Sequence, residues 1–212
     1  MAFQANDPGS NPGDRIHGSV ISKERWFVMM AGDIIEEFTA KDGRKFILRV
    51  PTMNDLSTYL DFINELVREG AEIQLNKEQT YEQEKEYLKE KLEKIASGDE
   101  ICVSVFLNDK LVGDAEIVRN PGRSFTTGTL GISLLEGYRD IGLGTEIMKI
   151  LLEKAKEAGY RMVILNVYAD NLRAIHLYEK FGFVRAGTIP KYAYFEGKGF
   201  VDSITMYKFL QE

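Results

Sequence analysis

The stretch of this chain that decides its fold is Gly131-Ile-Ser-Leu-Leu-Glu-Gly-Tyr-Arg-Asp-Ile-Gly-Leu-Gly144. An apolar run breaks into a glycine-rich turn, and the residues from about Thr145 onward have helical spacing. The pattern predicts a strand, a turn and a helix in direct succession. Backbone N–H groups in the first turn of a helix have no acceptor within that helix, and glycines let an anion approach them closely. We therefore expect this turn to bind an anionic group of the size of a phosphate.

Two common anion-binding turns do not match this stretch. A P-loop needs Lys and then Ser or Thr after its second glycine; Gly137 and Gly142 have the right separation, but Leu143 and Gly144 follow. A dinucleotide-binding turn needs a small third residue where Ile147 stands. A nucleotide site of either kind is thus disfavoured.

A third pattern fits, and a second segment supports it. The turn reads Arg139-x-x-Gly142-x-Gly144, and the chain continues after one helix and one strand with Leu165-Asn-Val-Tyr-Ala-Asp-Asn-Leu-Arg-Ala-Ile-His-Leu-Tyr-Glu-Lys-Phe-Gly-Phe183. The matching positions in this second segment are Asn171, Ala174, Tyr178 and the closing Phe181-Gly182-Phe183. Together the two segments resemble the cofactor-binding segments of the GNAT superfamily (GCN5-related N-acetyltransferases). The resemblance covers roughly Gly43 to the C-terminus, a single domain of ordinary size.

The resemblance implies an α/β fold, in which a central twisted mixed sheet with flanking helices is splayed in the middle, where acetyl-CoA inserts. Acetyl-CoA is therefore the expected cofactor, with its pyrophosphate on backbone amides of the turn and its pantetheine arm along the preceding strand. The implied cofactor-binding residues are Ile132, Leu134, Arg139, Asp140, Ile141, Gly142, Leu143, Gly144, Thr145, Asn171, Ala174 and Tyr178.

Tyr178 is expected to be a catalytic residue, because the resemblance implies that a tyrosine at this position protonates the departing thiolate. A phenol with a pKa of about 10 stays protonated at neutral pH and can donate to a stronger base. The same tyrosine could instead belong to an apolar helical stripe with Ala174 and Phe181. Asn171 could likewise be only a helix N-cap, a position that asparagine favours.

The general base is less well defined by the sequence. A primary alkyl amine with a pKa of about 10.4 needs roughly 4.6 kcal/mol to be neutral at pH 7, whereas an α-amino group near 7.8 needs only about 1 kcal/mol. Glu136, at the end of the strand, is the expected catalytic base, and Glu116, Glu69 and Glu72 are alternatives. Glu69 and Glu72 are also candidates for binding a cationic acceptor, together with Tyr194.

Composition narrows the range of functions. The chain has 212 residues, 44% hydrophobic and 28% charged, which suits one domain with an extension. A net charge of −6 argues against nucleic-acid binding and favours cationic partners such as amines. The single cysteine, Cys102, permits no internal disulfide and suits a reducing compartment. His17 and His176 lack partners at ligand spacing, so we expect no metal site.

No apolar run approaches the roughly 20 residues that cross a bilayer, and the N-terminus lacks a signal pattern, so no membrane association and a cytoplasmic location are expected. Residues 1–33 are expected to be a flexible tail or extension, and residues 34–212 the N-acetyltransferase domain. The apolar cluster Trp26-Phe-Val-Met-Met30 could dock on this domain or on a second subunit, which would make a homodimer.

Spacing and turn signals predict the element order of that domain. A hairpin (34–40 and 45–50) is followed by helices from 52 to 67 and from 81 to 97, strands 101–107, 111–118 and 124–135, a helix from 145 to 158, strand 161–167, helix 171–181, and strands 183–185, 191–195 and 201–209.

Three functions are compatible with these features. The first is direct acetyl transfer from acetyl-CoA to a small-molecule primary amine, such as a polyamine-like acceptor. The second is acetylation of protein N-termini or of a ribosomal protein. The third is a non-catalytic coenzyme A-binding regulatory module.

Overall fold

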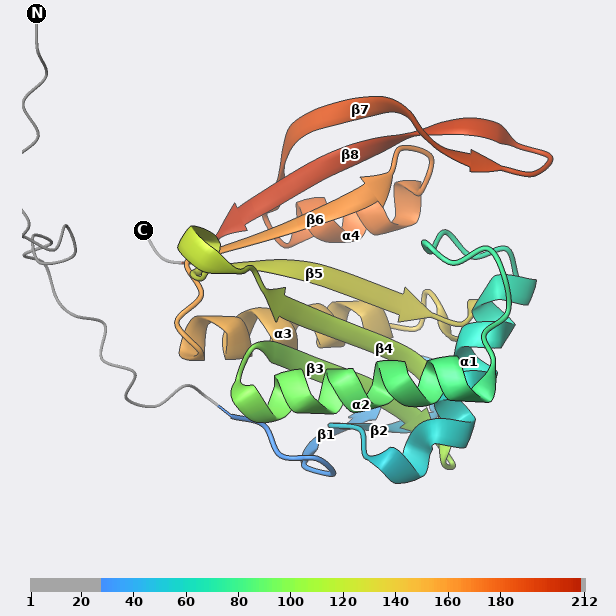
Figure 1. Cartoon of the computed structure of the whole chain (residues 1–212), viewed down its shortest axis with the longest axis vertical. Coiled ribbons are helices and arrows are strands. Elements are labelled where there is room, and N and C mark those ends of the chain that lie inside the picture. Colours follow the sequence, from blue (N-terminus) through green and yellow to red (C-terminus); the bar gives the residue numbers. More distant parts are fainter. Residues whose placement is uncertain (1–27, 211–212) are drawn as a thin grey trace, which may run out of the picture.

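The computed structural model describes residues 28–210 and has the alternation of strands and helices that the sequence predicts (Figure 1). The strands are β1 (Ile34–Thr39), β2 (Lys45–Arg49), β3 (Glu100–Leu107), β4 (Lys110–Arg119), β5 (Thr127–Leu134), β6 (Met162–Tyr168), β7 (Val184–Phe195) and β8 (Gly199–Phe209). The α-helices are α1 (Leu56–Arg68), α2 (Tyr81–Ser97), α3 (Leu143–Glu157) and α4 (Leu172–Lys180). Short 3-10 turns lie at Met53–Asp55, Gly122–Ser124 and Glu136–Tyr138.

All of these strands form one sheet in the order β1-β2-β3-β4-β5-β6-β8-β7. Neighbours are antiparallel except β5 and β6, which run parallel. Their pairing covers only Thr127 to Thr129 on β5 and Met162 to Ile164 on β6. Beyond these residues the two strands diverge (Figure 1), so the sheet is splayed in the middle, as the resemblance implies.

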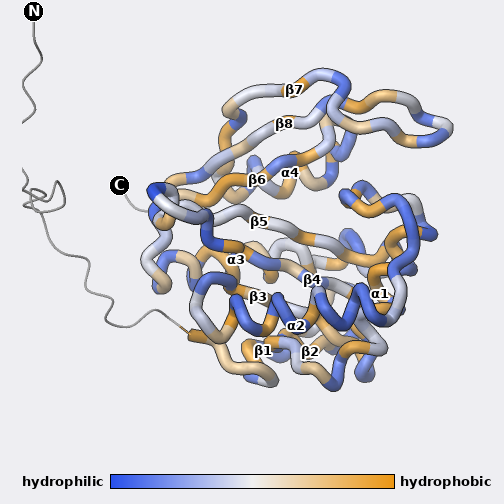
Figure 2. The backbone as a smooth tube through the Cα atoms, in the orientation of Figure 1, coloured by the Kyte–Doolittle hydropathy of each residue, from blue (hydrophilic) through white to orange (hydrophobic). Residues whose placement is uncertain are grey.

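Helices cover both faces of the sheet. α1 and α2 pack on one face of β3 and β4, and α3 lies on the opposite face, with α4 beside β6 and β8 (Figure 1). β6 is hydrophobic over most of its length because it is covered, whereas α2 alternates between hydrophilic and hydrophobic residues (Figure 2). The apolar core is continuous across β2 to β6 and the inner sides of the helices.

Capping residues explain the ends of α2 and the start of α4. Thr80 caps α2 by accepting a hydrogen bond from the Gln83 amide, and Gly98 ends that helix in the left-handed conformation with φ 79°. Asn171 caps α4, since its side chain accepts a hydrogen bond from the Ala174 amide. Asn171 is therefore a helix N-cap, the alternative that the sequence left open.

Several boundaries differ from the expectation: α1 begins at Leu56 rather than at 52, and β5 begins at Thr127 rather than at 124. α3 begins at Leu143, slightly before Thr145, because Gly142 already serves as its N-cap. The strands expected at 183–185 and 191–195 are parts of one long strand, β7. Irregular pairing between Ile189 and Ala193 accommodates Pro190, which has no N–H to donate, and lets both halves pair with β8.

The described part of the expected N-terminal extension, residues 28–33, packs against the domain. Met29 is buried in the core, and the Gly32 amide donates to the carbonyl of Val50. Trp26, Phe27 and the rest of the expected tail lie outside the described residues. Within residues 28–210, no helix has the length and apolar character needed to span a membrane.

Candidate active site

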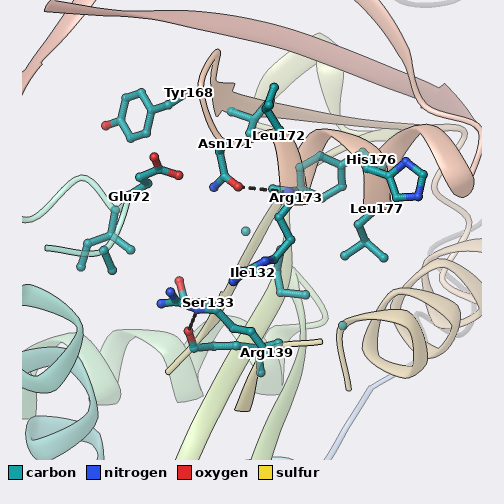
Figure 3. Close-up of a pocket in the computed structure, with 18 of the residues that line it drawn as sticks. Glu72, Ile132, Ser133, Arg139, Tyr168, Asn171, Leu172, Arg173, His176 and Leu177 are labelled. Atoms are coloured by element: carbon teal, nitrogen blue, oxygen red, sulfur yellow. Dashed lines mark hydrogen bonds between the residues drawn. The ribbon is translucent and has the colours of Figure 1, made fainter. Parts of the chain in front are cut away.

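The divergence of β5 and β6 opens a cleft of about 990 Å³. Its wall is built from β5, β6, the loop after α1, the turn before α3, and α4 (Figure 3). The residues of the expected site that line it are Glu69, Glu72, Ile132, Leu134, Glu136, Arg139, Asp140, Gly142, Gly144, Thr145, Asn171, Ala174 and Tyr178.

The edge of β5 that faces the cleft carries main-chain hydrogen-bonding groups. The Leu135 amide donates to Val112 on β4, so the amides of Ile132 and Leu134, which alternate with it, point to the opposite side, toward the cleft. β6 no longer pairs with β5 at this level. The Leu134 carbonyl accepts a hydrogen bond from Arg139 Nε at 2.8 Å. An extended ligand could therefore pair with Ile132 and with the amide of Leu134 as an added strand.

The turn before α3 presents a run of backbone amides. In the described part of the chain, the amides from Asp140 to Gly144 donate to no protein acceptor. The run expected from the sequence extends from Arg139 to Thr145. The amides at its two ends already have acceptors: the Arg139 amide donates to the Glu136 carbonyl, and the Thr145 amide donates to the Gly142 carbonyl. The run of amides open to an anion is thus shorter than expected, and it lies at the positive end of the α3 dipole.

The side chains of this turn have other tasks. Leu143 is fully buried, and the Ile141 carbonyl accepts a hydrogen bond from the Lys41 amide, which ties the turn to the β1–β2 hairpin. Gly142 has φ 102°, a conformation that L side chains rarely adopt. Ile141 and Leu143 can therefore reach a cofactor only through their amides.

Arg139 points away from the amide run and fixes the end of β5. Besides the Leu134 carbonyl, its guanidinium binds Glu69 Oε2 at 3.0 Å. Both carboxylate oxygens of Glu69 also lie within hydrogen-bond distance of the Glu136 amide, at 2.9 and 3.1 Å. These contacts give Glu69 a clamping role at the strand end, and its charge is already balanced by Arg139.

Tyr178 lies on α4 between the core and the cleft. It is only 6% exposed and packs against Phe183, with 5.9 Å between ring centroids. Its hydroxyl has no hydrogen-bond partner among the described residues but is not sealed from solvent. Burial holds the pKa of Tyr178 well above the usual value for a phenol. The side chain therefore stays protonated at neutral pH.

Two glutamates reach the cleft from neighbouring strands. Glu136 is exposed just beyond the end of β5, and Glu116 on β4 lies opposite Gly131 on β5. Glu116 Oε2 accepts a hydrogen bond from Lys91 Nζ at 2.8 Å. Both carboxylates are placed to take a proton from a group in the cleft.

At the other end of the cleft, Glu72 forms an ion pair with Lys198 of the β7–β8 hairpin at 3.0 Å, and Lys198 also pairs with Asp170. In Figure 3, Glu72 and Tyr168 lie on one side of Asn171, and His176 and Leu177 lie on the other. This end carries several acidic groups near an aromatic wall.

Sequence reasoning did not find every residue of this region. Tyr194 is 67% exposed, stacks on Phe200 and is absent from the cleft wall, because its strand position turns it outward. Tyr168 lines the cleft instead, held edge-on to Phe195 at 5.0 Å. His176 is exposed and also lines the cleft.

Lys91 was also missed. It is buried, and its spacing gave a signal, because Glu84, Leu88, Lys91 and Ile95 form the buried stripe of α2. A charged residue at helical spacing within an apolar stripe indicates a buried ion pair.

Comparison with known proteins agrees with this architecture. The family model described as "Acetyltransferase (GNAT) family" matches residues 63–183. The crystal structure of an acetyltransferase of the GNAT family from Streptococcus pneumoniae superimposes with a TM-score of 0.70 and 28% identity, covering 77% of this chain and 99% of that one. A GNAT superfamily phosphinothricin acetyltransferase from Sinorhizobium meliloti, solved in complex with acetyl-CoA, has a TM-score of 0.68 and 18% identity, covering 82% and 90% of the two chains.

Among curated sequences, N-alpha-acetyltransferase 30 of Dictyostelium discoideum is 27% identical over 94 residues, which is 44% of this chain and 51% of that protein. The matches span between 19% and 52% of the length of the curated relatives compared. The fold is thus that of N-acetyltransferases with a splayed mixed sheet. The chain belongs to the acetyltransferase (GNAT) family.

Proposed function

We propose that this protein transfers the acetyl group of acetyl-CoA directly to the amine of a small-molecule acceptor. The observation that carries the proposal is the convergence of three features on one cleft: the open main-chain edge of β5, the amides from Asp140 to Gly144, and the protonated phenol of Tyr178. Acetyl-CoA, when bound, supplies an activated thioester carbonyl.

The residues of the cleft fit this cofactor. The amide run and the α3 dipole suit a pyrophosphate, and the left-handed backbone of Gly142 keeps side-chain atoms out of its approach. Ile132 and Leu134 offer an edge for an amide-containing arm, and an amide there can stabilise the oxygen that becomes negative during transfer. Asn171 and Ala174 close the same region from α4.

In this proposal, two groups transfer protons. A glutamate, Glu136 or Glu116, takes one proton from the acceptor ammonium and later releases it to solvent. Tyr178 donates a proton to the departing sulfur and regains one from the nitrogen as that nitrogen becomes an amide. The balance is one ammonium and one thioester converted to one amide, one thiol and one released proton. No nucleophilic side chain is required, so transfer is direct.

The proposed acceptor is a primary amine with additional positive charge, because Glu72 and Asp170 line the end of the cleft away from the amide run and share a single cationic partner, Lys198. Acetylation of a protein N-terminus is the second candidate, and the name of the Dictyostelium relative favours it. A cytoplasmic location and a homodimer remain predictions from the sequence.

One assay separates these candidates from a coenzyme A-binding module. Thiol release from acetyl-CoA is measured with polyamines, aminoglycosides and short peptides as acceptors, and acetylated products are identified by mass spectrometry. We expect turnover with a small amine. Turnover with peptides alone would favour the protein acceptor, and coenzyme A binding without turnover for any amine would contradict the enzymatic proposal.

A second comparison identifies the base. E136Q and E116Q each remove one carboxylate charge and keep the side-chain size. The variant of the true base should lose turnover by about 10²-fold or more, whereas the other should keep it.

A further inference from the structure

A cluster of charged side chains is buried between α2 and the sheet, directly behind the cleft. Lys91 of α2 is only 2% exposed. Its Nζ lies 2.8 Å from Glu116 Oε2, 2.9 Å from Glu100 Oε1 and 3.0 Å from Asp114 Oδ2. One ammonium group therefore holds three carboxyl groups from β3 and β4.

Asp114 is the best-satisfied carboxylate of this cluster. Its Oδ1 accepts hydrogen bonds at 2.8 Å from both Tyr59 of α1 and Ser104 of β3. Burial by itself disfavours an ammonium ion, but the surrounding carboxylates, Asp114 foremost, outweigh it and raise the pKa of Lys91 well above its usual value. Lys91 is thus a permanent positive charge.

Other titratable groups face the cluster from each packed element. Glu84 and Tyr87 lie on α2, and Glu100 and Cys102 on β3. Burial raises the pKa of Glu84 and of Glu100 to about 7. Glu100 Oε1 lies close to Lys91 Nζ but outside hydrogen-bond geometry, whereas Lys91 donates a hydrogen bond to Glu116 Oε2. Glu116 is therefore the carboxyl group that Lys91 orients by a hydrogen bond, with Asp114 as a second ion-pair partner.

Glu116 is the member of the cluster that reaches the cleft. Its side chain is 27% exposed and lines the cleft, whereas Lys91, Glu100 and Asp114 are sealed. The opening depends on Gly131, since a Cβ there would lie 2.7 Å from Glu116 Oε1. One oxygen of Glu116 is thus fixed by Lys91, and the other lies over Gly131, on the face of the sheet that carries Ser133.

We propose that Lys91 is a positioning residue for acetyl transfer: it holds the carboxylate of Glu116 beside Gly131, oriented to take the proton of the acceptor ammonium. The proposal rests on the acetyltransferase function proposed above and assigns the base to Glu116 rather than Glu136. The proton moves from the acceptor nitrogen to the free oxygen of Glu116 and then to water in the cleft. Lys91 itself exchanges no proton: it keeps its hydrogen bond to Oε2 while the other oxygen of Glu116 takes and releases the proton.

The test compares K91M, which removes the charge at similar volume, with K91R, which keeps it. We expect K91M to lower kcat about 10²-fold with the best alkyl amine of the panel. The kcat of K91R should be at least about tenfold higher than that of K91M. The dissociation constant of coenzyme A should change by less than about twofold. K89M is the matched control, because Lys89 is exposed on the same helix; its kcat should equal that of the original protein.

Two readouts separate positioning from a structural role. The loss in K91M should be larger for an alkyl amine than for an α-amino acceptor, because the α-amino group needs less help to become neutral. In addition, K91M/E116Q should be no slower than E116Q alone, since the two side chains act as one unit. A structural defect would instead lower kcat equally for both acceptors, and its effect on kcat would multiply with that of E116Q.

Several outcomes would overturn the proposal: K91M as active as the original protein, equal losses for both acceptors, or E116Q with full activity while E136Q is inactive. If K91M does not fold, as judged by thermal unfolding, the K91R comparison between the two acceptors decides. In K91R, a loss of kcat that is larger with the alkyl amine than with the α-amino acceptor supports the proposal, and equal losses with the two acceptors contradict it. Failure of the proposed function is distinguishable, because the original protein would then turn over no amine at all.

Discussion

At the scale of single residues, the backbone conformation of Gly142 sets the geometry of the amide turn. Its φ of 102° is strained for any residue with a Cβ. We expect G142A to weaken coenzyme A binding about tenfold, because relief of the strain moves the amides from Asp140 to Gly144 out of line. Titration calorimetry with coenzyme A measures this.

Gly137 supplies the control for that experiment. It precedes the same turn, and a Cβ there would meet nothing within 4 Å. G137A should bind coenzyme A as tightly as the original protein. Equal affinity in all three proteins would show that the turn does not hold the cofactor.

The second prediction at this scale concerns Tyr178. Y178F keeps the ring that packs on Phe183 but removes the hydroxyl that is proposed to donate to sulfur. We expect kcat to fall by about 10²-fold while coenzyme A affinity stays nearly constant. Steady-state kinetics together with binding titration check this, and unchanged kcat would exclude Tyr178 as the acid.

Residue-level prediction from the sequence succeeded where a role follows from local spacing. The cap formed by Asn171 and the buried position of Tyr178 follow from their places in one helix. The sequence does not indicate how a side chain is directed by a distant partner. The guanidinium of Arg139 turns to Glu69, which is far away in sequence, and Tyr194 faces outward because of the bulged register of β7. No local pattern contains that information.

At the scale of elements, α2 combines an apolar stripe with buried charge. Its inner side carries Glu84 and Lys91 as well as Leu88 and Ile95. Burial raises the pKa of Glu84, and of Glu100 on β3, from 4.5 to about 7. The folded protein therefore binds more protons than the unfolded chain between about pH 4.5 and 7, and stability falls as pH rises through that window.

This gives a prediction about unfolding. E84Q and E100Q replace a carboxyl that is costly to ionise, so each should be more stable than the original protein at pH 8, by on the order of 1–3 kcal/mol, and nearly equal to it at pH 5. Urea unfolding at both pH values measures the difference. Equal effects at pH 5 and pH 8 would show that these groups do not titrate in the window.

Element boundaries were largely predictable, because capping residues and glycines are local signals. Thr80 caps α2 and Gly98 ends it, so this helix has the bounds expected from the sequence, 81 to 97. The continuity of β7 was not predictable, since Pro190 is ordinarily a reason to end a strand. Pairing with β8 on both sides of the irregularity overrides that local preference.

At the scale of the whole molecule, the charge distribution bears on the acceptor. The chain carries a net charge of −6, and Glu72, Glu116, Glu136 and Asp170 line the cleft. At saturating acetyl-CoA, we expect KM for a diamine to rise with salt more steeply than KM for a monoamine, because each charge is screened over about 10 Å at 0.1 M salt. Parallel salt dependence for the two acceptors would argue against an electrostatic acceptor site.

The splay of the sheet is the feature on which the whole account depends. β5 and β6 pair over a short segment and then separate, which leaves the edge of β5 and the amide turn facing one space. The most direct test is residue-resolved amide hydrogen exchange, measured by NMR with and without coenzyme A. We expect the cofactor to slow exchange at Ile132, at Leu134 and from Asp140 to Gly144. Binding of coenzyme A that protects none of these amides would contradict it.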